Sequence, residues 1–115
     1  MHFVKALFII LVGQILKDIM KSSEITNYGY RAFSSGDYDA AIKYFTHLDT
    51  KSSSYWSGRL YLSMSYWYSG KTGSAIQALK DISEWCPDND LKQKALFALR
   101  ELTAADDRLF GRNSN

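Results

Sequence analysis

Residues of the kinds that build chemical sites are scarce in this chain of 115 residues. Its one cysteine, Cys86, excludes a framework of disulfides and any metal site made of cysteines alone. There are two histidines and one proline. The 14 basic and 12 acidic residues leave no excess of the kind that nucleic-acid-binding proteins gather on one face, so no nucleic-acid partner is expected. What remains is a single folded domain without evident chemistry.

The residues that could support catalysis do not converge. His47 has Lys43 and Lys51 one helical turn away on either side, which is typical of a histidine on a solvated face. Asp37 and Asp39 stand where a helix is expected to begin, and negative charge is favourable there. We therefore expect no enzymatic activity, no cofactor and no metal site.

Apolar side chains dominate residues 1–21 and would occupy every face of a helix, not one stripe. The uncharged stretch of residues 6–16 is short, whereas a membrane span normally needs about 20 residues. Three interpretations stay open: an uncleaved membrane anchor, which we favour, a helix packed against the domain or a partner, and a cleaved secretory signal. Localisation at a membrane is accordingly favoured, with a soluble cytoplasmic or an exported protein as the alternatives.

A shift that carries residue 35 onto residue 69 aligns two parts of the chain without a gap. Ser35-Gly36 then falls on Ser69-Gly70, and Ala41-Ile42 falls on Ala75-Ile76. Three conservative matches accompany these identities: Tyr28 with Leu62, Phe45 with Leu79 and Leu48 with Ile82. Within each copy, apolar residues recur at spacings of three and four on both sides of the Ser-Gly break. The pattern predicts two consecutive pairs of helices.

The ends of these helices can be predicted from single residues. Gly36 and Gly70 can adopt the positive φ that ends many helices. Asp37 and Thr72 are expected to cap the helices that follow. Pro87 is expected to stop the last helix of the second pair. Small residues are expected where helix backbones approach closely: Gly29, Ala41, Ser63 and Ala75. Cys86 is expected to be a small buried or half-buried filler.

These residues resemble the tetratricopeptide repeat family, whose helix pairs recur at intervals of about 34 residues. The first repeat, residues 22–55, matches the family pattern at Tyr28, Gly29, Gly36, Tyr38, Ala41 and Phe45. The second repeat, residues 56–89, matches it at Leu62, Ser63, Tyr66, Gly70, Ala75, Leu79 and Pro87. The chain departs from the pattern at Ala32, Ser53 and Thr72. The resemblance thus covers residues 22–89.

The resemblance implies an all-α fold, a short helix-turn-helix solenoid, and the apolar run before it predicts a hydrophobic N-terminal helix at residues 1–21. The repeat domain would occupy residues 22–107 and end in a cap helix at residues 90–107, begun by Asp88 or Asp90, and residues 108–115 would form a flexible tail. Two repeats are few for such a fold, because its stability comes from stacking of neighbours. Residues 7–19 packed on the first repeat, or self-association, could supply the missing contacts.

In proteins of this family the first helices of the repeats line a concave groove that receives a segment of a partner. The resemblance implies a groove formed by Tyr30, Phe33, Leu60, Met64, Trp67 and Tyr68. For Phe33 and Trp67 the alternative is packing between helix pairs. Thr26, Tyr30 and Tyr61 stand where co-chaperones of the family place carboxylate-binding residues. We therefore expect an apolar or mixed ligand instead of an acidic chain end.

The function expected from the sequence is that of a non-catalytic adaptor or scaffold that binds another protein and is tethered to a membrane through residues 1–21. Two alternatives remain: an accessory subunit of a membrane protein complex, and a small chaperone of secretion or assembly. The identity of the partner and the oligomeric state do not follow from the sequence.

Overall fold

The computed structural model describes residues 21–110, and within this range the chain forms five helices and no strand. The helices are α2 (Ser22–Ser34), α3 (Tyr38–Thr46), α4 (Tyr55–Tyr68), α5 (Thr72–Trp85) and α6 (Asn89–Phe110). The predicted all-α class is confirmed. The interpretations of residues 1–21 and of the tail fall largely on residues 1–20 and 111–115, which lie outside the described residues. None of the helices in the described part combines the length and the hydropathy that a membrane crossing requires.

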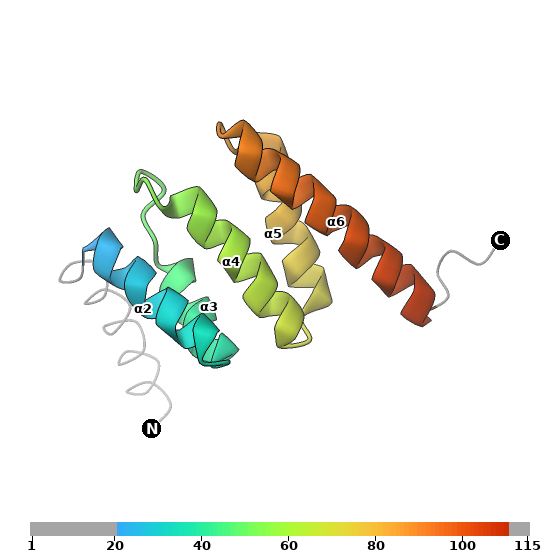
Figure 1. Ribbon diagram of the computed structural model, residues 1–115, viewed down its shortest axis with the longest axis horizontal. Coiled ribbons are helices and arrows are strands. Elements are labelled where there is room, and N and C mark those ends of the chain that lie inside the picture. The colour runs from blue at the N-terminus through green and yellow to red at the C-terminus, as the bar shows by residue number, and fades with distance from the viewer. Residues whose placement is uncertain (1–20, 111–115) are drawn as a thin grey trace, which may run out of the picture.

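The helices lie in two rows. Helices α2, α4 and α6 run side by side in the same direction, and α3 and α5 lie behind them (Figure 1). Each helix packs against the next one along the chain, and in addition α2 contacts α4 and α4 contacts α6. Helix α4 therefore has packed neighbours on both of its sides.

The two Ser-Gly breaks form the same turn. Gly36 and Gly70 have φ values of 81° and 83°, which confirms the predicted positive φ at both positions. In the first turn the Asp37 amide donates to the Ala32 carbonyl at 2.9 Å, and in the second the Lys71 amide donates in the same way to the Tyr66 carbonyl at 2.8 Å. These bonds use carbonyls that the ends of α2 and α4 would otherwise leave without a partner.

Of the two caps predicted after these turns, one is confirmed and one is wrong. Asp37 caps α3, because its Oδ1 accepts a hydrogen bond from the Ala40 amide at 3.2 Å. Thr72 does not cap α5: it is the first helical residue, and Lys71 stands at the cap position without a capping side-chain bond. The hydrogen bond from the Lys71 amide to the preceding helix places the cap at residue 71, one residue earlier than expected.

The start of α6 depends on Asp88. Its Oδ1 accepts from the Asp90 amide at 2.9 Å and from the Leu91 amide at 3.3 Å. Of the two predicted caps, Asp88 is thus the one that acts, and Asp90 lies inside the helix. Helix α5 ends at Trp85, ahead of Pro87 as expected. Helix α6 runs from residue 89 to residue 110, beyond the predicted limits of 90–107.

The core has two parts, one on either side of α4. The first joins α2, α3 and α4 through Ile25, Ala41, Phe45, Leu48 and Leu62. The second joins α5 and α6 through Leu79, Ile82, Cys86 and Ala95, with Trp56 and Leu60 of α4 packed against it. The predicted burial of Cys86 is confirmed. The predicted small residues at close approaches are also buried: Gly29, Ala41, Ser63 and Ala75.

Replacement of Gly29 by alanine should destabilise the domain. A Cβ atom at position 29 would lie 2.7 Å from two atoms of the buried Phe45 ring. We expect a loss of about 1–3 kcal/mol from overpacking, which exceeds the gain of about 1 kcal/mol that alanine brings to a helix. The free energy of unfolding in urea, followed by circular dichroism, measures the change.

Gly73→Ala is the matched control, since Gly73 also lies in a helix but a Cβ there would meet nothing within 4 Å. It should leave stability unchanged or raise it by up to about 1 kcal/mol. Equal effects of the two replacements would contradict the close approach of Phe45 to Gly29.

Candidate functional site

Acid–base and metal-binding side chains do not gather in the described part of the chain. Between residues 21 and 110 no three histidine, cysteine, aspartate or glutamate side chains are placed to hold a metal ion. His47, at the end of α3, places Nδ1 2.6 Å from the backbone carbonyl oxygen of Lys43. Its ring is therefore engaged with its own helix, and the candidate site lies elsewhere.

An open pocket of about 240 Å³ lies where α4, α5 and α6 meet. The residues around it are mostly apolar: Ser63, Met64, Trp67, Tyr68, Leu79, Phe97, Ala98, Glu101 and Leu102. Tyr68 and Phe97 are 56% and 66% exposed, respectively, although they are large hydrophobic residues. Exposed apolar surface that borders a cavity is typical of a binding site and not of a simple solvated face.

Helical spacing brings these side chains together. Met64, Trp67 and Tyr68 are spaced by three and four residues, so they share one face of the second half of α4. Across the pocket, Ala98, Glu101 and Leu102 repeat the same spacing on α6. The two helices run in the same direction (Figure 1), and the two sets line the same pocket.

Buried polar groups near the pocket are satisfied within α4. The Ser63 hydroxyl donates to the Leu60 carbonyl at 2.6 Å, and the Ser65 hydroxyl donates to the Tyr61 carbonyl at 2.8 Å. Both serines are at most 1% exposed. Because their hydroxyls have partners in their own helix, they add little polarity to the pocket.

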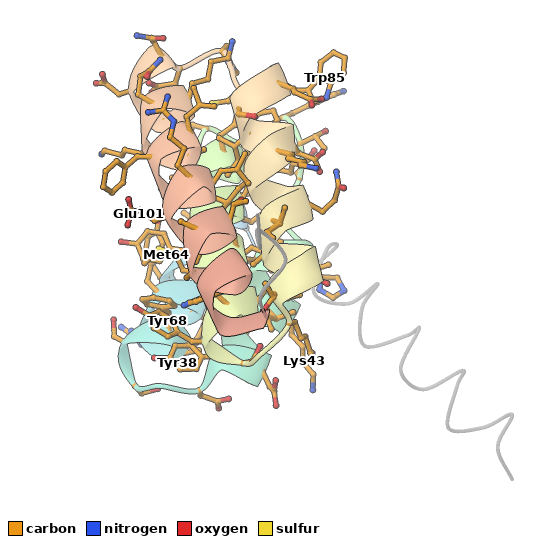
Figure 2. All side chains as sticks on the ribbon, turned by 90° about the vertical axis from the view of Figure 1, so that its right-hand side faces the viewer. Tyr38, Lys43, Met64, Tyr68, Trp85 and Glu101 are labelled. Atoms are coloured by element: carbon orange, nitrogen blue, oxygen red, sulfur yellow. The ribbon has the colours of Figure 1, made fainter. Side chains whose placement is uncertain are left out.

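Stacking on a second tyrosine fixes the position of Tyr68. The rings of Tyr38 and Tyr68 lie 5.1 Å apart at an interplanar angle of 22°, and Phe33 lies 6.1 Å from Tyr68. Figure 2 shows Tyr38, Tyr68, Met64 and Glu101 along one side of the molecule, with Trp85 and Lys43 toward the other. The pocket thus continues, through Tyr68, into a row of aromatic rings that reaches α3 and α2.

The structure divides the six residues predicted to line a groove. Met64, Trp67 and Tyr68 come together at the pocket. Leu60 packs against the second part of the core. Tyr30 and Phe33 are half-buried between helices.

The packing of Tyr30 and Phe33 is tight. The Tyr30 ring centre lies 4.7 Å from that of Tyr61 and 5.5 Å from that of Phe45. Phe33 meets Tyr61 edge-on at 5.2 Å. Truncation of Tyr30 would therefore disturb the first part of the core, so this residue is unsuited to a test of binding.

The α6 side of the pocket was not predicted as part of a binding site. Phe97, Ala98, Glu101 and Leu102 supply it. A signal for three of them is present in the sequence, because the shift that carries residue 35 onto residue 69 also carries Met64 to Ala98, Trp67 to Glu101 and Tyr68 to Leu102. The shift that aligns the first two copies thus also aligns the two walls of the pocket.

Glu101 gives the pocket its charge. It is exposed, and among the described residues that line the pocket it is the charged one. An apolar cavity with a carboxylate at its edge suits a ligand that has a bulky apolar group and a nearby cation. An exposed ion pair contributes about 0–1 kcal/mol, so the apolar contact must supply most of the affinity.

No family model matches the chain, and no curated protein or solved structure matches it either. What the protein does must therefore be inferred from its own residues, distances and charges.

Stacking between Tyr38 and Tyr68 should be measurable as a coupling free energy. In a double-mutant cycle with Tyr38→Ala and Tyr68→Ala, we expect the two losses of stability to be non-additive by about 0.5 kcal/mol or more. The free energies of unfolding of the four proteins give this value.

The control cycle pairs Tyr38→Ala with Trp85→Ala, since Trp85 lies toward the other side of the molecule (Figure 2). That pair should be additive within about 0.3–0.5 kcal/mol. Additivity in both cycles would show that Tyr38 does not hold Tyr68 at the pocket.

Proposed function

We propose that the chain is a tetratricopeptide-like solenoid that acts as a non-catalytic adaptor and binds a segment of a partner protein in the pocket between α4 and α6. The observation that carries the proposal is the open apolar pocket, whose exposed Tyr68 and Phe97 lie outside both parts of the core.

The arrangement of the helices supports a solenoid of stacked pairs. Helix α4 packs on the pair α2 and α3, and α6 packs on the pair α4 and α5. Leu62 and Leu96, which the repeat shift makes equivalent, each lie on the helix that begins a new layer. Under this proposal, residues 89–110 are the first helix of a third layer.

The size of the pocket favours a protein side chain as its occupant. Sites for small molecules and cofactors usually measure about 300–1,000 Å³, whereas this pocket measures about 240 Å³. The pocket is also open to solvent, and Tyr68 in its lining continues into a row of aromatic rings with Tyr38 and Phe33. We therefore propose a partner segment that inserts one bulky apolar side chain and continues across the surface.

Charge narrows the chemistry of this segment further. A lysine or arginine next to the inserted side chain would meet Glu101 at the edge of the pocket. The attraction orients the segment more than it strengthens the complex, because the carboxylate is exposed to water. The occupant we propose is thus a partner segment that combines a bulky apolar residue with a basic one.

A displayed library of random peptides, selected against the full chain, tests this function. Peptides with an aromatic or large aliphatic residue close to a lysine or arginine should be enriched. Ala98→Trp, which fills the pocket, and Phe97→Ala, which removes one wall, should each weaken a selected peptide at least about tenfold, that is by about 1.4 kcal/mol. Fluorescence anisotropy of the labelled peptide gives the Kd values.

Trp85→Ala is the matched control, since Trp85 is as exposed as Phe97, at 72% against 66%, but does not line the pocket. It should leave the Kd unchanged. Glu101→Gln should weaken basic peptides and spare the same peptides with the basic residue replaced by glutamine. Selected peptides that bind Ala98→Trp and the unmodified protein equally would overturn the proposal.

A further inference from the structure

Aromatic rings from two helices line the pocket between α4 and α6. Trp67 and Tyr68 stand on α4, and Phe97 stands on α6. Tyr38 stacks on one face of the Tyr68 ring at 5.1 Å, yet Tyr68 is 56% exposed, so its exposed surface belongs mainly to its edge and its other face. Phe97 is 66% exposed. The pocket therefore offers the π-electron surface of aromatic rings to an occupant, in addition to apolar volume.

Tyrosine rings elsewhere in the domain are paired with cations of the chain itself. The Arg31 guanidinium lies over the Tyr28 ring and the Arg59 guanidinium lies over the Tyr55 ring, each at 5.9 Å from the ring centre. A cation in such a place is attracted by the negative face of the ring. Within the described part of the chain the rings of the pocket form no such pair, and no lysine or arginine is among the described residues that line it. A cation from another molecule can therefore approach these rings.

Glu101 places a carboxylate beside the rings, on the side of the molecule where Tyr68 also lies (Figure 2). The residues one helical turn before and after Glu101 carry no charge: Phe97, Ala98, Ala104 and Ala105. None of them can form the ion pair that often engages an exposed carboxylate on a helix. The pocket thus combines three aromatic rings with a negative charge, the surroundings that favour a weakly hydrated cation.

Methylation of a lysine produces such a cation. The unmodified ammonium is compact and strongly hydrated, so its entry among apolar side chains removes favourable contacts with water. Trimethylation replaces its three N–H donors with methyl groups and keeps the positive charge. The product has apolar bulk and charge in one group, and aromatic rings recognise it through cation–π attraction.

We propose that the pocket binds the trimethylated side chain of a lysine in the partner protein. Its ammonium group would lie among Trp67, Tyr68 and Phe97, with Glu101 balancing the charge. The inference rests on the proposed function, because it names the side chain that the partner segment inserts. Recognition would then depend on modification of the partner and not only on the sequence of the partner.

Three versions of one peptide test the inference on the full chain. The starting peptide is the tightest one from the random library, with its basic residue changed to glutamine. Its inserted residue is replaced by trimethyllysine, by lysine, or by the neutral analogue that has carbon in place of the ammonium nitrogen. By fluorescence anisotropy, the trimethyllysine peptide should bind at least about tenfold more tightly than the lysine peptide and about threefold more tightly than the neutral one. Equal Kd values for the trimethyllysine peptide and either of the others would overturn the inference.

Phe97→Leu separates the π surface from the apolar bulk, because leucine keeps an apolar side chain but has no ring. It should weaken the trimethyllysine peptide at least about threefold and change the Kd of the neutral peptide by less than about twofold. Glu101→Gln should act with the same selectivity. Trp85→Leu, at an exposed position outside the pocket, is the control and should affect neither peptide. Equal weakening of both peptides by Phe97→Leu would overturn the inference, since apolar contact alone would then explain binding.

This inference and the proposed function fail on different results. If the starting peptide binds at least about tenfold more tightly than all three substituted peptides, the proposed function stands and the inference is wrong. If no selected peptide loses affinity for Ala98→Trp, the pocket holds no partner segment and both are wrong. Displacement of the trimethyllysine peptide by phosphatidylcholine vesicles would assign the site to a lipid headgroup and would overturn its assignment to a partner protein.

Discussion

The burial of the Phe45 ring between α2 and α4 is the contact on which the rest of the structure depends. The ring is 1% exposed, and two of its atoms stand where a Cβ of residue 29 would be, so α2 can approach α3 only because residue 29 is a glycine. Tyr30 and Tyr61 complete the enclosure. This packing fixes α4 against the first helix pair, and α4 in turn presents Met64, Trp67 and Tyr68 to α6.

Features that depend on local backbone geometry, or on the regular spacing of residues along the chain, could be predicted from the sequence. The positive φ of Gly36 and Gly70 could be predicted because each glycine follows a stretch in which apolar residues recur every three or four positions, as expected at the end of a helix. The burial of Ala41 and Ala75 follows from small residues that recur at one position of each copy. The cap of α5 could not be predicted from residue type alone, because the position that the shift makes equivalent to Asp37 is Lys71, whose side chain cannot accept a hydrogen bond from the helix amides, whereas Thr72 is the first helical residue.

Features that depend on how helices pack could be predicted only in part. Tyr30 lies on α2 and Trp67 on α4, each the first helix of a helix pair, yet Tyr30 is enclosed by Tyr61 and Phe45 whereas Trp67 lines the pocket. The difference arises from the neighbouring helices, because the spacing of apolar residues does not specify which side chains those helices place against Tyr30 or Trp67. Of the α6 wall, Phe97 could not be predicted for the same reason, since it occupies the position equivalent to the buried Ser63 but is exposed on the last helix of the described chain.

Helix α4 is covered from two sides, and this has a consequence for the order in which the domain opens. The outer helices can detach one at a time, but α4 can leave only when both parts of the core are broken. Its amide protons should therefore exchange with solvent most slowly, and those of α6 should exchange through local opening. Because α6 forms one wall of the pocket, detachment of α6 would dismantle the pocket while the first helix pair stays folded. A segment that bridges α4 and α6 would slow amide exchange in α6, so occupancy of the pocket can be observed without labelling the partner.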